Sequence, residues 1–171
     1  MKNPLRDEIK NGKNYKPDFI IMREIQRDIV AALIFSRDGK LFLGLERKGG
    51  VYDDCWHITG GGVDPGENKE EALKREVKEE TGIDITGYKI DLIDDTKSGE
   101  SKKILPSGEE VFVKMKFYDY RVDINDKNAD EITVSLNDDL VEYRWTTLDE
   151  LPNLKLTPPS TELFKKLGYL K

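Results

Sequence analysis

The sequence has very little cysteine and histidine, and this excludes two kinds of site. It contains one cysteine, Cys55, and one histidine, His57. A single cysteine cannot form an intramolecular disulfide, and a single histidine cannot build a histidine-rich metal centre. We therefore interpret Cys55 as a small buried residue and His57 as a structural residue of a strand.

Long apolar runs and excess positive charge are also missing. No apolar run approaches the length needed to span a bilayer, and the charged stretch of residues 1–16 has no apolar segment of the signal-peptide type. Lys and Arg number 28 against 34 Asp and Glu, which gives a net charge of −6. An acidic chain gains nothing from counterion release on long nucleic acid. We expect a cytoplasmic protein that binds neither membranes nor long nucleic acid.

What is present suffices for one domain with a charged surface. The chain has 171 residues, of which 37% are hydrophobic and 36% charged. We expect residues 27–171 to form this domain. Residues 1–26 are polar except for a short apolar patch, and we expect an N-terminal extension that serves as an arm or as a contact in a homodimer.

The order of apolar runs and turn residues predicts a mixture of strands and helices. The run of residues 29–35 is typical of a strand covered on both faces. Asp38-Gly39 predicts a hairpin turn into the next strand. The remaining expected elements are strands at 40–46, 56–59, 87–95, 110–122 and 140–146, a hairpin tip at 97–109, a one-turn helix at 147–151 and a helix at 160–167.

A glycine-rich turn leads into the helix around which the chain is organised. Asn68 followed by Glu71 forms a capping box, which marks the start of a helix. Gly82 stands where a residue in the left-handed conformation would end it. The sequence therefore predicts a helix between these two signals.

Three glutamates of this helix lie side by side. At about 100° per residue, Leu73 and Val77 share a buried stripe, and Glu76, Glu79 and Glu80 fall beside it. Like charges on adjacent turns repel one another. The arrangement favours a divalent cation such as Mg²⁺ among the carboxylates, although a solvated acidic helix face has the same spacing.

The full stretch distinguishes between these alternatives. Residues 61–83 read GGVDPGENKEEALKREVKEETGI, in which Gly61, five residues, Glu67, seven residues and the run from Arg75 to Ile83 match the complete Nudix box. The chain resembles the Nudix hydrolases. It departs from many members only at Thr59, where they have proline. The resemblance implies an α/β/α sandwich with a mixed β-sheet, the box helix on one side and the C-terminal helix on the other.

The resemblance also implies a reaction and the residues for it. Water attacks a phosphorus of a nucleoside diphosphate linked to another group, with Mg²⁺ or Mn²⁺ as cofactor. The implied metal ligands are Glu76, Glu79, Glu80 and the backbone carbonyl of Gly61. Glu79 and Glu76 are the catalytic carboxylates, and Arg75 orients a carboxylate by a charge-assisted hydrogen bond.

Further site residues are expected outside the box. An additional acid often follows in this family, and Asp139 and Glu142 are our candidates, with surface charge as the alternative interpretation. Arg47 and Lys48 are candidates to contact phosphates, unless they are simply solvated. Tyr52 is a candidate to stack on a base, with core packing as the alternative.

Short segments point to a substrate class. Residues 56–67, 94–97 and 108–111 resemble a bacterial branch of nucleoside triphosphatases that act on pyrimidine deoxynucleotides, which implies conversion of a nucleoside triphosphate to a monophosphate and pyrophosphate. Hydrolysis of oxidised nucleotides or nucleotide sugars, or a non-catalytic nucleotide-binding module, are the alternatives. Isopentenyl-diphosphate isomerisation needs a histidine-rich metal site, which one histidine argues against.

Overall fold

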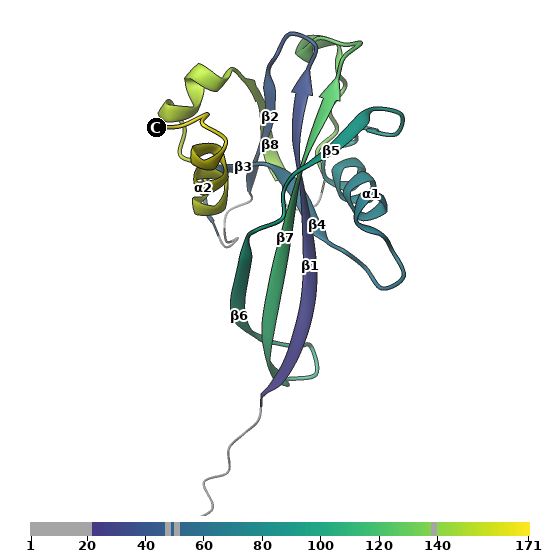
Figure 1. Ribbon diagram of the computed structural model, residues 1–171, viewed down its shortest axis with the longest axis vertical. Coiled ribbons are helices and arrows are strands. Elements are labelled where there is room, and N and C mark those ends of the chain that lie inside the picture. The colour runs from purple at the N-terminus through teal and green to yellow at the C-terminus, as the bar shows by residue number, and fades with distance from the viewer. Residues whose placement is uncertain (1–21, 47–48, 50–51, 138–139) are drawn as a thin grey trace, which may run out of the picture.

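The computed structural model describes residues 22–46, 49, 52–137 and 140–171. Within these ranges, eight strands form one mixed sheet, with α-helices on both sides (Figure 1). The elements are β1 (Arg23–Ser36), β2 (Leu41–Glu46), β3 (Trp56–His57), β4 (Thr59–Gly62), α1 (Lys69–Thr81), β5 (Lys89–Asp94), β6 (Ser98–Ile104), β7 (Glu110–Ile124), η3 (Ala129–Glu131), β8 (Leu140–Thr146), η4 (Leu148–Asn153) and α2 (Pro158–Lys166).

The centre of the sheet is a long parallel pair. Strand β1 runs beside β7 from the pair Arg23–Val111 to the pair Ser36–Ile124. Strand β1 also pairs antiparallel with β2 and β4, while β7 pairs antiparallel with β5 and β6. One end of β1 and β7, together with β6, extends beyond the two helices as a three-stranded ribbon (Figure 1).

The second half of strand β1 is buried on both faces, which explains its unbroken apolar run. Successive side chains of a strand point to opposite faces of the sheet. The core on one face contains Val30, Ala32 and Ile34 of β1 with Ala72, Leu73 and Val77 of α1. The core on the other face contains Leu33 and Phe35 of β1 with Leu163 and Phe164 of α2. The expected sandwich is confirmed, with the box helix and the C-terminal helix on opposite sides.

Helix α1 begins and ends at the predicted signals. The Asn68 side chain accepts a hydrogen bond from the Glu71 amide at 2.9 Å, and the Glu71 carboxylate accepts one from the Asn68 amide at 2.9 Å. Gly82 has a φ of 71° and donates its amide to the Lys78 carbonyl at 2.9 Å. No helix in the described part of the chain is long and apolar enough to cross a membrane.

Two expected boundaries differ markedly from the structure. Strand β1 begins at Arg23, so residues 23–26 belong to the sheet, because β7 continues beside them and supplies their backbone partners. The expected hairpin tip at 97–109 is wrong, since most of it forms β6 and the turn is confined to residues 105–109. The sequence does not predict strand β6, because this strand is largely exposed and has no alternation of apolar residues. Residues 1–21 of the expected extension lie outside the described residues.

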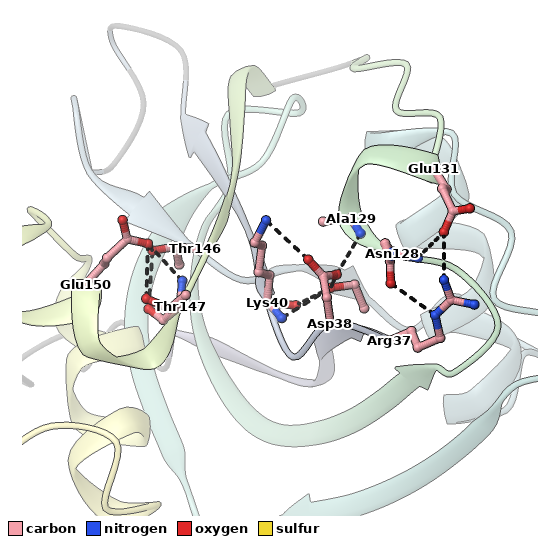
Figure 2. A network of polar contacts seen from close by, with 10 residues as sticks. Arg37, Asp38, Lys40, Asn128, Ala129, Glu131, Thr146, Thr147 and Glu150 are labelled. Carbon is pink, nitrogen blue, oxygen red and sulfur yellow. Dashed lines mark hydrogen bonds and ion pairs between the residues drawn. The ribbon is translucent and has the colours of Figure 1, made fainter.

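The turn between β1 and β2 is fastened to the segment around η3. The Asp38 carboxylate accepts hydrogen bonds from the Ser36 hydroxyl at 2.7 Å and from the Ala129 amide at 2.8 Å (Figure 2). These bonds lower the pKa of Asp38 to about 2. Next to it, Arg37 donates to the Asn128 side chain at 3.0 Å. The Asp-Gly turn therefore carries a structural network.

Helix α2 is fixed to the sheet by a charged contact. Lys166 Nζ donates to Asp94 Oδ1 at 2.6 Å and to the Thr96 hydroxyl at 2.7 Å. Burial alone would raise the pKa of Asp94, but the hydrogen bonds from Lys166 and Thr96 lower it to about 2. The ion pair thus stabilises the folded state while Asp94 is charged.

We expect Lys166→Met to lower the free energy of unfolding at pH 7 by about 1–3 kcal/mol, because a buried carboxylate loses a charged hydrogen-bond donor. Asp94 titrates near pH 2 in the folded state and near about 3.9 when unfolded. The difference in the free energy of unfolding between wild type and variant should therefore be fully present above the unfolded pKa of Asp94. It should shrink as the pH falls through the folded pKa.

Urea denaturation across this pH range measures the difference. Lys165→Met is the matched control, because Lys165 is in the same helical turn and is equally exposed, but only Lys166 pairs with Asp94. Equal stability of Lys166→Met and wild type at pH 7 would contradict the anchoring role.

Candidate active site

The three glycines before the box helix lie in a strand instead of the expected turn. Strand β4 pairs with β1, and Gly60 lies directly opposite Ala31. A Cβ atom at Gly60 would collide with the Val30 carbonyl oxygen and with Ala31. A Cβ atom at Gly61 would collide with the Glu76 carboxylate. The glycines thus let the β4 backbone approach both β1 and α1.

Arg75 holds the first part of the box together. Its guanidinium forms a bidentate pair with Glu67 at 2.8 and 2.9 Å and donates to the Gly62 carbonyl at 3.0 Å. It also donates to Glu76 at 2.8 Å and to Glu79 at 3.0 Å. The hydrogen bonds with Glu67 raise the pKa of Arg75 and lower that of Glu67. Glu67 braces the loop, and Arg75 orients two of the predicted metal-binding carboxylates.

Glu80 contacts strand β4. Its carboxylate accepts a hydrogen bond from the Gly60 amide at 3.1 Å and a short one from the Thr59 hydroxyl. Thr59, the position that departs from many family members, is fully buried and supplies a donor that proline lacks. The structure thus brings all three box glutamates to β4 or to Arg75.

These residues fit a divalent cation in chemical type. Carboxylate and carbonyl oxygens are the ligands that Mg²⁺ prefers, and the absence of a Cβ at Gly61 lets the main chain lie against the Glu76 carboxylate. In the described ranges, no three His, Cys, Asp or Glu residues are gathered as a ready metal site. Arg75 and the Thr59–Gly60 segment engage the carboxylates, so binding an ion requires these side chains to turn.

A cavity of about 290 Å³ begins at this point. Gly60 and Glu80 line one part of it, and the start of α2 lines another. The side chains that matter for its chemistry are those of Glu46, Tyr52, His57, Glu80, Lys97 and Asp119. The cavity therefore connects the box helix with residues that no sequence motif had brought together.

The residues predicted outside the box have mixed positions. Tyr52 lines the cavity and is 37% exposed, so it is not a core residue. Glu142 is exposed on β8, opposite Leu45. The segment that precedes β8 is tied to the box helix, because the Asn137 amide donates to the Glu80 carbonyl at 3.0 Å. Arg47, Lys48 and Asp139 lie outside the described residues.

Sequence reasoning missed Lys97 and Asp119. Asp119 is 3% exposed in the middle of β7 and lies 3.6 Å from Lys97 Nζ. A signal was available, because an aspartate between Tyr118 and Tyr120 interrupts an otherwise strand-like run, and buried charges are rare unless they have a role. Cys55, in contrast, is buried and free as expected.

Comparison with known proteins identifies the family. The model of the NUDIX domain matches residues 25–167. The chain belongs to this family. It is a Nudix hydrolase, and the family assignment confirms the resemblance read from the box.

Relatives agree with this assignment, and solved structures share the fold. The chain is 30% identical over 148 residues to the nucleoside triphosphatase NudI of Klebsiella pneumoniae, which covers 85% of this chain and 99% of that protein. The match to NudI of Escherichia coli K12 is 30% over 152 residues, with the same coverage. The fold resembles that of a MutT protein from Methanosarcina mazei, with a TM-score of 0.57, 24% identity and coverage of 86% and 98%. It also resembles the Nudix hydrolase RenU of M. smegmatis, with a TM-score of 0.60, 16% identity and coverage of 84% of each chain.

The close approach of Gly61 to Glu76 gives a test of the site. We expect Gly61→Ala to displace the Glu76 carboxylate and to lower kcat/KM of the hydrolase about 100-fold, since small misplacements at a catalytic centre have effects of that size. Gly62→Ala is the matched control, because its Cβ would meet only the end of the Arg27 side chain. Steady-state kinetics and thermal melting of both variants measure the effect. Wild-type activity of Gly61→Ala would show that the position of Glu76 is irrelevant.

Proposed function

We propose that this Nudix hydrolase converts a nucleoside triphosphate to a nucleoside monophosphate and pyrophosphate. The observation that carries the proposal is the cavity that begins at Glu80 and Gly60 and continues along the sheet to α2. Such a cavity suits a substrate whose phosphates lie at the box helix and whose nucleoside lies farther in. The names of the relatives support a nucleoside triphosphate.

We propose Mg²⁺, with Mn²⁺ as a substitute, as the cofactor. Glu76, Glu79, Glu80 and the carbonyl of Gly61 would hold it. When bound, the ion neutralises phosphate charge and lowers the pKa of a coordinated water. Oxygen donors on a glycine strand and one helix are the observation that supports this choice.

The chain's own residues accept the proton and orient the reacting groups. In the reaction, the water oxygen forms a bond to phosphorus, the phosphoanhydride P–O bond breaks, and the departing pyrophosphate takes the electron pair. Glu79 or Glu76 accepts the water proton, with Glu142 and Asp139 as further acids. Arg75 keeps Glu76 and Glu79 oriented by hydrogen bonds of 2.8 and 3.0 Å. We place Tyr52 against the base and Arg47 and Lys48 at the phosphates.

We expect Glu79→Gln and Glu80→Gln each to lower kcat by about 100-fold or more, because a neutral amide neither holds a cation nor accepts a proton as a carboxylate does. The fold should persist, since Glu79 is half exposed and a glutamine at position 80 keeps an oxygen for the Gly60 amide. Glu70→Gln, on the exposed face of the same helix, is the control. Full activity of either site variant with Mg²⁺ would refute the assignment.

A hydrolysis screen with separate detection of pyrophosphate and phosphate tests the substrate class. The panel contains the canonical and oxidised nucleoside triphosphates, nucleotide sugars, dinucleoside polyphosphates and NADH. Pyrophosphate release that is greatest with pyrimidine deoxynucleotides is the expected result. Activity confined to a nucleotide sugar or an oxidised nucleotide would keep the reaction and replace the substrate.

The cytoplasmic location and the homodimer stay predictions. Sedimentation at micromolar concentration tests the homodimer.

A further inference from the structure

The part of the cavity away from the box helix contains a buried charged group for which the proposed reaction has no use. Asp119 is 3% exposed, and its Oδ2 atom accepts no hydrogen bond within the described residues. Burying a carboxylate costs free energy unless it is paired and hydrogen-bonded. An apolar residue would fill this position in β7 at lower cost, so the carboxylate calls for a role beyond stability.

The register of the sheet fixes where Asp119 lies relative to the box. Ala31 of β1 is directly opposite Gly60 of β4 on one side and directly opposite Asp119 of β7 on the other. Two strand spacings amount to about 10 Å, which is the scale of a nucleoside. The row runs from Gly60 through Ala31 to Asp119, so only an alanine side chain stands between the glycine and the carboxylate. A substrate with its phosphates at Glu80 therefore brings its base towards Asp119.

Lys97 sets the position of the Asp119 carboxylate. Its Nζ lies 3.6 Å from Asp119 Oδ2 and donates to the Pro159 carbonyl at 3.3 Å, which ties it to the start of α2. The neighbouring carboxylate, Asp94, is already occupied by Lys166 at 2.6 Å. Burial raises the pKa of Asp119, and the charge of Lys97 opposes this rise. Both Asp94 and Asp119 keep an Oδ2 atom without a hydrogen-bond partner among the described residues. Of the two, only Asp119 lines the cavity, so its Oδ2 atom is the one available to a bound substrate.

A second polar atom lies in the same cavity wall. The Nδ1 atom of His57 lies 2.8 Å from the Ile58 carbonyl, which places the proton of the neutral ring on Nδ1. Its Nε2 atom is then an acceptor, and it is buried with no hydrogen-bond partner among the described residues. The acceptors Asp119 Oδ2 and His57 Nε2 and the donor Lys97 are together complementary to a base edge that carries both N–H donors and an acceptor.

Resting on the proposed function, we propose that Asp119 is a specificity-determining residue that accepts a hydrogen bond from an N–H group on the pairing edge of the nucleobase, with Lys97 as its positioning residue. The N4 amino group of cytosine and the N3–H of thymine or uracil are donors of this kind. A nucleotide whose base lacks the donor leaves the buried Asp119 Oδ2 without a hydrogen bond, which is the more costly situation.

The test compares nucleotides that differ only in this donor. One pair is deoxycytidine triphosphate and its 2-pyrimidinone analogue, which lacks the amino group. The other is thymidine triphosphate and its N3-methyl analogue. We expect the wild-type protein to prefer the donor-bearing member of at least one pair by about 10- to 100-fold in kcat/KM, the range of a hydrogen bond to a charged group.

In the Asp119→Asn variant, the ratio of kcat/KM between the donor-bearing nucleotide and its analogue should fall to near one. The variant's amide oxygen faces Lys97 and its amino group faces the base, so an acceptor is replaced by a donor. KM for the donor-bearing nucleotide should rise while kcat changes little, because the carboxylates at the box helix are untouched. Lys97→Gln should lower the ratio in part. Asp123→Asn, on the same strand and paired with Arg121, is the control and should keep the wild-type ratio.

The outcomes separate this inference from the proposed function. A wild-type protein that hydrolyses no nucleoside triphosphate contradicts both. Equal kcat/KM within each pair, or an Asp119→Asn variant that keeps the wild-type ratio, contradicts this inference alone. Should Asp119→Asn fail to fold, the ratio measured for Lys97→Gln decides, and an unchanged ratio there overturns the proposal.

Discussion

The close approach of β4 to β1 is the constraint on which the site depends. There is no space for a side chain at Gly60, because the Val30 carbonyl and Ala31 occupy it. This contact places the Gly60 amide where the Glu80 carboxylate can accept from it. It also brings Gly61 against Glu76. One short glycine-rich strand thus sets the spacing between sheet and helix and the orientation of two carboxylates.

Arg75 offsets the repulsion among the acidic side chains of the box. Acidic groups on adjacent turns of α1 repel one another, and one guanidinium compensates by contacting Glu67, Glu76 and Glu79 at 2.8 to 3.0 Å. Its planar fork offers five donors in fixed directions, which lysine does not. The same contacts hold the Glu76 and Glu79 carboxylates in fixed orientations. For a cation to bind among them, these side chains would have to turn.

The sequence predicts those parts of the structure that depend on local signals. The capping box at Asn68 and the left-handed Gly82 are local backbone chemistry, so both helix ends were placed correctly. The box pattern identified Glu76, Glu79 and Glu80 as a group for the same reason. The location of Asp119 was not predictable, because it depends on the register between β1 and β7, which no local pattern encodes. Strand β6 was missed since its exposed residues have no apolar period.

The parallel pairing of β1 with β7 also bears on how the protein folds. Its partners lie far apart in the sequence, for example Arg23 with Val111. Contacts between distant segments form slowly, because loop-closure entropy is lost before they are gained. The local helix α1, with its own caps, needs no such closure. We therefore expect the wall that contains Asp119 to form after helix α1 during folding. A nucleotide that binds only the finished cavity then stabilises the native state by mass action and slows its unfolding.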